Sequence, residues 1–270
     1  ATLLHFENRQ MDHDGNHDGF MDMPKLRQYN IMHRWAYVSP LWISQLMLRG
    51  LHDERKGGQS FKHLSPTSAE PPYSTAIKTN RYELQWKNGF TLNADHNTSV
   101  ALMLHGSWHD ADHIFGFTQY DVTQKNGYAQ LMFETDVNEH HNLSVGASLN
   151  HDYYNERLNP LDTLPNAEHK TTHETTPGIY AQYTYKLGHQ LTIMPGVRWD
   201  YSSRYGGFVT PRLHVKYAPS DLITLRSSIG KAYRSPHALA ENVTLLASGR
   251  DILISPNLKQ EEAWNMGASA

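Results

Sequence analysis

The most constraining feature of this sequence is a period-two alternation of apolar and polar residues. Between positions 191 and 201, the odd positions carry Leu, Ile, Pro, Val, Trp and Tyr, whereas the even positions carry Thr, Met, Gly, Arg and Asp. Because successive side chains of a β-strand point to opposite faces of a sheet, the alternation predicts a strand with one apolar face. The same pattern recurs at 82–86, 100–105, 143–150, 179–187, 213–217 and 223–230. Residues 41–52 alternate less regularly, and we predict a strand there from the strands on either side.

The connections between these segments alternate in length. Short turns are expected near 39–40, 93–96, 137–141, 187–189 and 218–221. Long polar loops are expected between them, near 9–24, 54–75, 157–173 and 235–257. Two shorter loops are expected near 109–117 and 203–208. About 12 strands result, and no amphipathic helix pattern competes with them. We therefore predict an all-β, antiparallel, up-and-down meander, and its turn–loop alternation is typical of a transmembrane β-barrel.

A soluble β-sandwich or propeller is the alternative, since a sandwich also buries one face of each strand. Two features favour the barrel. Aromatic residues gather near strand ends, as in the girdles at membrane interfaces: Trp35, Tyr37, Trp42, Trp86, Tyr185 and Tyr217. The polar face is rich in charge, which suits a water-filled lumen: Arg81, Glu83, Lys87, Arg198, Asp200, Arg212, Lys216 and Arg226.

The composition argues against several other classes of protein and of site. The absence of cysteine excludes disulfides and thiolate metal sites. A net charge of −3 argues against a nucleic-acid-binding protein, which usually carries a basic excess. We find neither a run of 18 apolar residues, as a membrane-spanning helix needs, nor a signal peptide within the chain.

Residues 1–7 and 259–270 also have the strand pattern. A meander that begins and ends in this way would leave two unpaired edges, which a bilayer does not tolerate. We therefore expect residues 1–270 to form part of a larger barrel.

One long segment carries a family resemblance. Residues 211–217 read P-R-L-x-x-K-Y, residues 225–236 read L-R-x-S-x-G-x-x-Y-R-x-P and lead to Glu241, and residues 257–264 read N-L-K-x-E-x-x-W. In order, spacing and turn length this stretch resembles the TonB-dependent outer-membrane receptors. The family-motif residues are Gly230, Tyr233, Arg234, Pro236 and Glu241. They are expected to shape the exit from strand to loop.

The resemblance implies a barrel fragment of about 12 strands from a 22-stranded barrel in the outer membrane of a Gram-negative bacterium. It implies that a plug domain, through which the partner TonB acts, and the C-terminal strands are absent from this chain. Residues 23–35 and 54–59 also resemble the cobalamin-transporter-like branch of the Bacteroidetes, in whose relatives calcium orders the outer loops.

Residues 12–22 read Asp-His-Asp-Gly-Asn-His-Asp-Gly-Phe-Met-Asp. Alternate oxygen ligands followed by a glycine are the pattern of calcium loops, because the oxygens converge on one hard cation. Lys25 stands where an EF-hand has its bidentate Glu, so a full EF-hand is excluded. The expected ligands of a structural calcium ion are Asp14, Asn16, Asp18, Phe20 through its carbonyl, and Asp22. The alternative is an acidic, solvated loop.

Three successive strands are expected to turn charged residues toward the lumen: Arg198, Asp200, Arg212, His214, Lys216 and Arg226. These side chains would contact the plug or an anionic substrate, or would simply form a hydrated wall. Of the 18 histidines, His13, His17, His140, His141, His169 and His173 are expected in polar loops or turns. No nucleophile–base pair or phosphate loop is evident, so we predict no enzyme.

These expectations combine into a TonB-dependent receptor that imports a scarce nutrient, such as cobalamin or a ferric chelate (siderophore or haem), across outer-membrane lipid. Two alternatives stay open. One is a soluble extracellular β-rich binding module stabilised by calcium, and the other is a passive outer-membrane pore.

Overall fold

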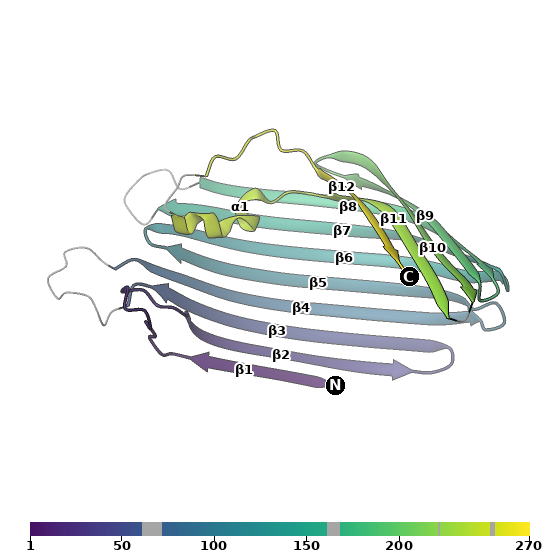
Figure 1. The fold of residues 1–270 in the computed structure, drawn as a ribbon, viewed down its shortest axis with the longest axis horizontal. Helices are drawn as coiled ribbons and strands as arrows, with labels where there is room; N and C mark the ends of the chain where they lie inside the picture. The colour runs from purple at the N-terminus through teal and green to yellow at the C-terminus, as the bar shows by residue number, and fades with distance from the viewer. Residues whose placement is uncertain (61–71, 161–167, 221, 249–251) are drawn as a thin grey trace.

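The computed structural model describes residues 1–60, 72–160, 168–220, 222–248 and 252–270. They form one antiparallel sheet of 12 strands, in which each strand pairs with its neighbours in sequence (Figure 1). The strands are β1 Thr2–Arg9, β2 Lys25–Val38, β3 Trp42–Gly58, β4 Ser74–Asn93, β5 Thr98–Phe115, β6 Thr118–Asn138, β7 His141–Pro160, β8 Glu168–Leu187, β9 Leu191–Ser202, β10 Gly206–Ser220, β11 Ile223–Arg234 and β12 Glu261–Ser269. This confirms the predicted all-β, up-and-down meander.

Two short helical segments lie between β11 and β12. They are α1 Ala238–Glu241 and the 3-10 helix η2 Val243–Ser248. In the described part of the chain, no helix has the length and apolar character needed to cross a membrane.

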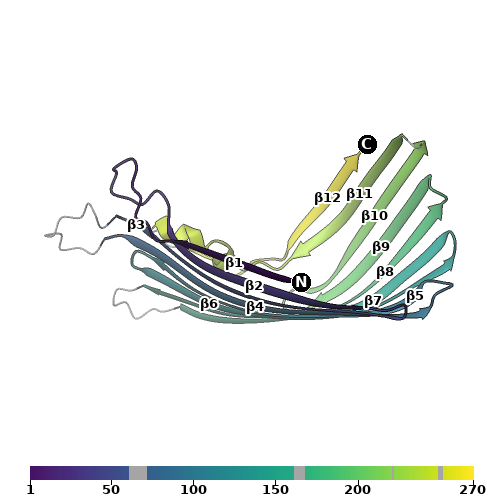
Figure 2. The same cartoon turned by 90° about the horizontal axis from the view of Figure 1, so that it is seen from below.

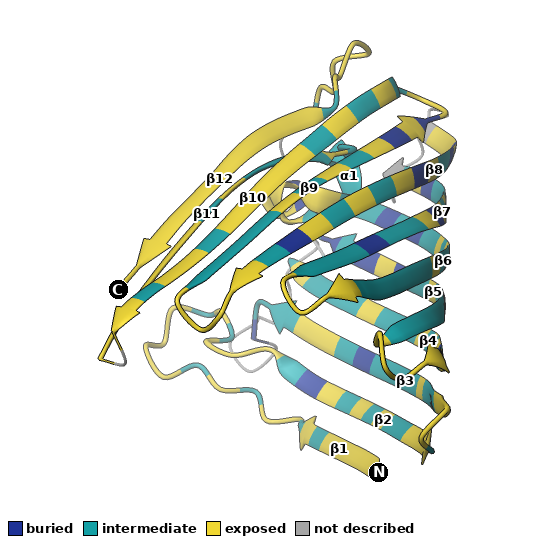
Figure 3. Cartoon of the chain, turned by 90° about the vertical axis from the view of Figure 1, so that its right-hand side faces the viewer, coloured by how far each residue is buried: buried dark blue, intermediate teal, exposed yellow. Residues whose placement is uncertain are grey.

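The sheet is bent into an open trough. Figure 2 shows β9–β12 rising steeply from the flatter part formed by the earlier strands, with α1 on the concave side. The edge strands β1 and β12 do not pair with each other, so the barrel is not closed within the described residues. Every residue of β12 is exposed, and Figure 3 shows exposed and less exposed residues alternating along most of the other strands.

Strand register separates the side chains into two sets. Residues directly opposite each other in an antiparallel sheet share a face, and Arg198 lies opposite both Tyr180 and Thr210. Followed from strand to strand, this register places the charged residues of the apolar-banded part on the concave face, whose loop end α1 and η2 cover. The apolar and aromatic residues take the convex face.

Aromatic residues bound an apolar band on the convex face. Near the short turns, Trp42 stacks on Phe90, with ring centroids 6.1 Å apart. Farther along β4, Tyr82 stacks on Trp108 at 5.6 Å. Tyr82 and Phe90 are eight residues apart, which is about 26 Å at ~3.3 Å per residue, less when the strand is tilted. The band therefore matches the hydrophobic height of an outer-membrane barrel.

Beyond Tyr82 and Trp108 the convex face becomes polar. The next convex-face residues on these strands are Asn80 and Lys78 on β4 and Asp110 and Asp112 on β5. Strands β4–β8 contain 18 to 21 residues each, roughly twice the 9–11 that cross a membrane. The strands therefore extend well past the membrane on the side of the long loops.

This extension corrects several predicted loops. Residues 109–117 belong mostly to β5, and the connection to β6 is a tight turn in which Gly116 has φ +59°. The start of β8 contains His169 and His173, which we expected in a loop. Outside the membrane both faces of a strand are polar, so the alternation that predicts a strand fades there. Parts of the expected loops 54–75, 157–173 and 235–257 lie outside the described residues.

Candidate functional site

The six residues predicted to face the lumen all lie on the concave face. Arg198 and Asp200 come from β9, Arg212, His214 and Lys216 from β10, and Arg226 from β11. Register places them on one face, because Arg198 lies opposite Thr210, which shares a face with Arg212, and Lys216 lies opposite Arg226. Their functional role stays a prediction.

Arg198 and Asp200 form a compact ion pair against the wall. Arg198 Nε donates to Asp200 Oδ2 at 2.7 Å, and its Nη2 donates to Ser148 Oγ at 2.6 Å on β7. The pair lies over Gly178, where a Cβ atom would be 1.9 Å from Asp200 Oδ1. Asp200 is only 4% exposed, so the absent side chain of Gly178 gives the pair its room.

Arg212 lies flat on the wall in a similar way. Its Nη2 donates to Gln182 Oε1 at 2.6 Å. A Cβ atom on Gly196 would be 2.8 Å from Arg212 Nε, and one on Gly230 would be 3.4 Å from Arg212 Cβ. The family-motif residue Gly230 thus leaves space for an arginine of the wall.

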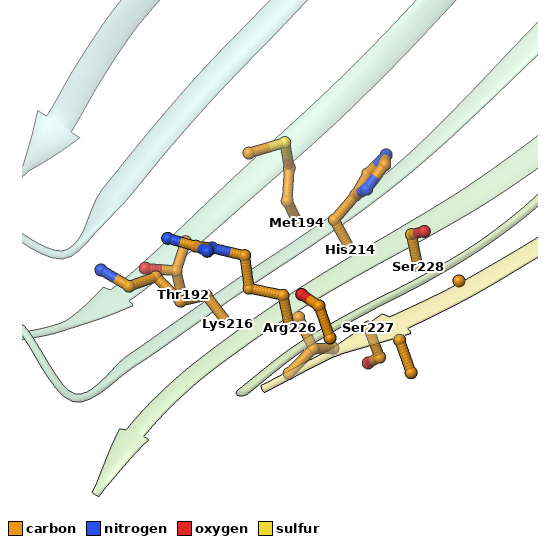
Figure 4. Close-up of a pocket in the computed structure, with 11 residues that line it drawn as sticks. Thr192, Met194, His214, Lys216, Arg226, Ser227 and Ser228 are labelled. Atoms are coloured by element: carbon orange, nitrogen blue, oxygen red, sulfur yellow. The ribbon is translucent and has the colours of Figure 1, made fainter. Parts of the chain in front are cut away.

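His214, Lys216 and Arg226 line a separate groove near the short turns. Figure 4 shows their side chains together with Thr192 and Ser228. Lys216 and Arg226 form no ion pair with a carboxylate of the described residues, unlike Arg198. The structure therefore separates the Arg198–Asp200 ion pair from Arg212, Lys216 and Arg226, which have no carboxylate partner among the described residues.

The family-motif residues bind the end of β11 to the following connection. Arg234, the last residue of β11, contacts Glu241 at 3.0 Å and Glu261 at 2.9 Å. The Arg234 guanidinium holds the pKa of the Glu261 carboxyl below its usual value. Tyr233 packs against Phe208, with ring centroids 4.7 Å apart, and Pro236 lines a cavity described below. This arrangement fits the expected role at the strand-to-loop exit.

The connection between β11 and β12 crosses the concave face to distant strands. Leu246 is buried in a cluster with Phe115, Tyr120 and Val122 from β5 and β6. Tyr73 donates its hydroxyl proton to the Ala247 carbonyl at 2.9 Å. The connection therefore covers the loop end of the trough, and burial of these apolar side chains holds it there.

A polar cavity of about 460 Å³ lies between this connection and the wall. Its charged and aromatic lining includes Glu156, Lys170, Arg204, Tyr205 and His237. Glu156 is 5% exposed and accepts a hydrogen bond from the Tyr120 hydroxyl at 2.8 Å. A buried carboxylate with cations nearby is suited to hold the polar groups of a ligand of moderate size.

A second buried carboxylate lies next to this cavity. Glu174 Oε1 accepts hydrogen bonds from Ser202 Oγ at 2.6 Å and Ser235 Oγ at 2.7 Å. Its Oε2 has no hydrogen-bond partner in the described part of the chain and lies 3.8 Å from Arg204 Nη1. Glu174 therefore attaches the start of the connection to the wall and retains one oxygen that can accept a further proton donor.

His237 completes the loop end of the site. Its ring stacks on Tyr154 of β7, with centroids 3.8 Å apart. Burial lowers the pKa of His237, an effect that the carboxylate of Glu156 partly opposes. The ring is therefore mainly uncharged near neutral pH.

Sequence reasoning missed the residues of this cavity. Glu156 and Glu174 lie directly before and after the segment 157–173 that we expected to be a loop, so their common face was not apparent. Their even numbering, continuous with Ser148 and Tyr180 on the same strands, was the available signal. His237 follows Pro236 directly, yet nothing in the sequence shows that it meets Tyr154.

The predicted calcium residues lie in the connection between β1 and β2. Backbone N–H groups of the loop donate to three of them: Gly19 to Asp14 at 3.1 Å, Phe20 to Asp18 at 2.8 Å and Gly15 to Asp22 at 2.6 Å. Asn16 Oδ1 accepts from the Asp18 N–H at 3.2 Å. Across the described residues, no group of three or more His, Cys, Asp or Glu side chains could hold a metal ion. Calcium binding therefore stays a prediction.

Comparison with known proteins adds the family context. The family model described as "TonB dependent receptor-like, beta-barrel" matches residues 42–269. A search of curated protein sequences returns no match.

Several solved structures are similar in fold. A mutant of the ferric enterobactin receptor from Pseudomonas aeruginosa is 15% identical, with a TM-score of 0.59, covering 86% of this chain and 36% of that one. The alcaligin outer membrane receptor from Bordetella pertussis is 11% identical, with a TM-score of 0.59, covering 81% of this chain and 37% of that one. The ferric citrate transporter in its unliganded form is 13% identical, with a TM-score of 0.58, covering 92% of this chain and 41% of that one. The chain thus spans less than half of each, and at these identities the likeness concerns the fold alone.

Proposed function

Because this chain belongs to the TonB-dependent receptor β-barrel family, whose members are outer-membrane proteins of Gram-negative bacteria, we propose that it forms part of the wall of a nutrient importer. The cargo would be a scarce metal chelate, held first at the loop end of the trough. The polar cavity beneath the β11–β12 connection carries this proposal. It combines the buried carboxylate of Glu156, two cations and the rings of Tyr205 and His237, with the buried carboxylate of Glu174 next to it, at the end of the wall that lies outside the membrane.

Two observations support the proposed class of cargo. Three structures similar in fold are named for ferric enterobactin, alcaligin and ferric citrate. The cavity volume of about 460 Å³ lies in the range of small-molecule sites. A ferric chelate is therefore the first candidate, and cobalamin is the second, on the resemblance of residues 23–35 and 54–59 to the cobalamin-transporter-like branch of the Bacteroidetes.

Energy for release would come from TonB, acting through a plug domain outside residues 1–270. The concave wall would face that plug. A passive pore is less well supported, because the β11–β12 connection covers the loop end of the concave face. The outer-membrane family in turn disfavours the soluble binding module.

Calcium would order the β1–β2 connection. Asp14, Asn16, Asp18, Asp22 and the Phe20 carbonyl provide only oxygen atoms, which calcium prefers. Two contacts already attach this connection to the end of β3: Met21 N–H donates to the Gly58 carbonyl at 2.9 Å, and Ser60 N–H donates to the Gly19 carbonyl at 2.8 Å. A bound ion would reduce the ordering entropy that the connection loses when cargo binds.

The test uses the whole receptor, expressed from its complete gene and extracted from outer membranes. The receptor is challenged with a ferric chelate or with cobalamin, and retained iron, cobalt and calcium are quantified by elemental mass spectrometry. Stoichiometric iron supports a ferric chelate, whereas cobalt moves the cargo to cobalamin. Retention of neither metal would reject the metal-chelate proposal.

A matched pair of variants tests the cavity itself. Arg204→Ala removes a cation of the cavity, and Lys87→Ala removes an exposed cation of the concave face on β4, away from the cavity. We expect the first to lower metal retention at least about tenfold, equivalent to ~1.4 kcal/mol. The second should leave retention unchanged, and an equal loss in both variants would contradict the assignment of the cavity.

A further inference from the structure

An apolar groove opens on the convex side of the sheet, in the half of the apolar band nearer the long loops. Its volume is about 800 Å³, within the range of small-molecule sites. Its rim consists of side chains that project from the convex face: Ile31, His33, Leu48, Tyr82, Leu84 and Trp108. The groove is therefore a hollow in the surface that faces the membrane.

Glycines create this hollow. Gly50 lies on β3 opposite Tyr82, and Gly106 lies on β5 opposite Gly127 of β6. A Cβ atom on Gly106 or Gly127 would meet no atom within 4 Å. These two glycines thus differ from Gly178 of the concave wall, whose missing side chain makes room for neighbouring residues. The space over Gly106 and Gly127 is open to an occupant from the membrane.

Unpaired hydrogen-bond donors lie at the outer end of the groove. In the middle of the band, the indole N–H of Trp86 donates to Ser44 Oγ at 3.2 Å. The indole N–H of Trp108 and the hydroxyl of Tyr82, by contrast, have no hydrogen-bond partner among the described residues, and these side chains are 46% and 51% exposed. Lys125 of β6 lies directly opposite Trp108 and is exposed on the same face. Three donors, one of them charged, therefore lie where the apolar band ends.

Lys125 is placed to meet an anionic group. Its Nζ lies 5.5 Å from the centroid of the Tyr153 ring, a cation–π contact on the same face. Asp110, diagonally across on β5, accepts a hydrogen bond from Thr123 Oγ1 at 2.7 Å. It forms no ion pair with Lys125 in the part of the chain that the structure describes. The Lys125 ammonium can therefore pair with an anion at the edge of the band.

We propose that the groove binds an acyl chain of an anionic, phosphate-bearing membrane lipid, whose head group lies against Tyr82, Trp108 and Lys125. Phosphate oxygens accept hydrogen bonds from all three donors, and the bond from a charged amine is the strongest. The acyl chain needs no hydrogen bonds. The one polar ring of the rim, His33, already has Thr2 Oγ1 2.7 Å from its Nδ1.

The position of the groove favours a lipid over a protein segment that spans the membrane. Gly106 is two residues, or about 6.6 Å, inside the aromatic boundary at Trp108. A spanning segment would need a groove along the full height of the band, whereas this one is confined to the half nearer the long loops. A head group at the boundary and a chain directly below it match both parts of the site.

Photolabelling of the whole receptor in phosphatidylcholine vesicles tests the site. The vesicles contain a small share of phosphatidylglycerol that carries a diazirine midway along one acyl chain. Light expels dinitrogen, and the resulting carbene inserts into a nearby C–H bond, so peptide mass spectrometry locates the chain. Labelling should concentrate on β3–β5. Gly106→Leu fills the groove and should lower this labelling at least about tenfold, equivalent to ~1.4 kcal/mol.

Gly89→Leu is the matched control. It is the same substitution at a glycine whose added Cβ also meets no atom within 4 Å, but on the concave face, and it should leave labelling unchanged. Lys125→Gln should abolish the preference for labelled phosphatidylglycerol over phosphatidylcholine with the same diazirine chain. Even labelling around the band, equal labelling in the two glycine variants, or an unchanged preference in Lys125→Gln would overturn the proposal.

Isolated outer membranes test the identity of the occupant. A photoreactive benzoylphenylalanine takes the place of Leu48 on the rim, and the mass of its adduct is measured after irradiation. An adduct with the mass of a lipid supports the proposal. An adduct with another polypeptide, or none with a lipid, would overturn it. The inference rests on the membrane placement of the convex face and not on the cargo, so the metal-retention test can fail while this one succeeds.

Discussion

His237 stacks on Tyr154 with ring centroids 3.8 Å apart and ring planes inclined by 20°. The two residues are far apart in sequence, and their contact attaches the β11–β12 connection to the inner wall of β7. The buried cluster around Leu246 lies farther along the same connection. Besides the hydrogen bonds at Ser235 and Ala247, the docked connection is held by one aromatic contact and one apolar cluster, and these two can be tested separately.

Removing the aromatic contact should loosen the connection without unfolding the barrel. Aromatic pairs contribute about 0.5–1.5 kcal/mol beyond burial, so His237→Ala should lower the local opening free energy of residues 239–246 by about that amount. Amide hydrogen exchange measures it directly. His189→Ala, in the exposed turn between β8 and β9, is the control and should change nothing in this segment. Equal protection of the segment in both variants would show that the stacking does not hold it.

Docking of the connection should weaken in acid. Burial lowers the pKa of His237 in the docked state, whereas an undocked histidine titrates near its ordinary value of about 6.5. Below that pH the undocked state binds the extra proton, so the docking free energy is fully present above it and decreases as the pH falls. Hydrogen-exchange protection, corrected for intrinsic rates, should therefore drop between pH 7 and pH 5. His237→Phe keeps a ring without a titrating group, and a similar drop in that variant would exclude His237 as the cause.

The two faces of β5 should respond oppositely to a charge. Leu104 lies opposite Trp86 in the middle of the apolar convex band, whereas Ala101 lies on the concave face opposite Gly89. An arginine at the lipid-facing midplane costs about 2–4 kcal/mol. Leu104→Arg should therefore lower the temperature at which the folded form is lost on a heat-modifiability gel, and Ala101→Arg should leave it nearly unchanged. The reverse order would show that the faces have been assigned wrongly.

A methyl group under the Arg198–Asp200 pair should destabilise the wall. In Gly178→Ala the new Cβ would lie 1.9 Å from Asp200 Oδ1 and 2.6 Å from Arg198 Nη2. The pair would have to move, and overpacking of this kind typically costs about 1–3 kcal/mol. Gly89→Ala on the same face meets no atom within 4 Å and is the matched control. Thermal unfolding of the two variants should differ, and identical curves would mean that the pair adapts freely.

Chelation of calcium should expose the β1–β2 connection to protease if the proposed site exists. Asp18→Asn keeps an oxygen that can accept the hydrogen bond from the Phe20 N–H group, but it removes the negative charge that Asp18 would present to the calcium ion. This variant with calcium should therefore be cleaved within residues 10–24 as readily as the natural protein in a chelator. Cleavage of the natural protein that does not depend on calcium would reject the site.

The sequence alone determines the strands and their two faces. Alternation over residues such as 191–201 predicts both the strand and the side of the sheet on which Arg198 lies, because successive strand residues point to opposite faces. Register then places all six predicted lumen residues on one face. The predictions weaken at the loop ends, where both faces are polar and the signal disappears. There the loop expected at 109–117 proved to be strand.

Only the tertiary structure decides which of these residues meet. Leu246 reaches Phe115 and Tyr120, and His237 reaches Tyr154, across separations that no local pattern encodes. Arg198 finds Asp200 within its own strand, whereas the meeting of Lys216 with Arg226 depends on the register between β10 and β11. A period-two pattern specifies the face of each side chain, but contacts between distant segments depend on how the sheet bends and how its connections cross it.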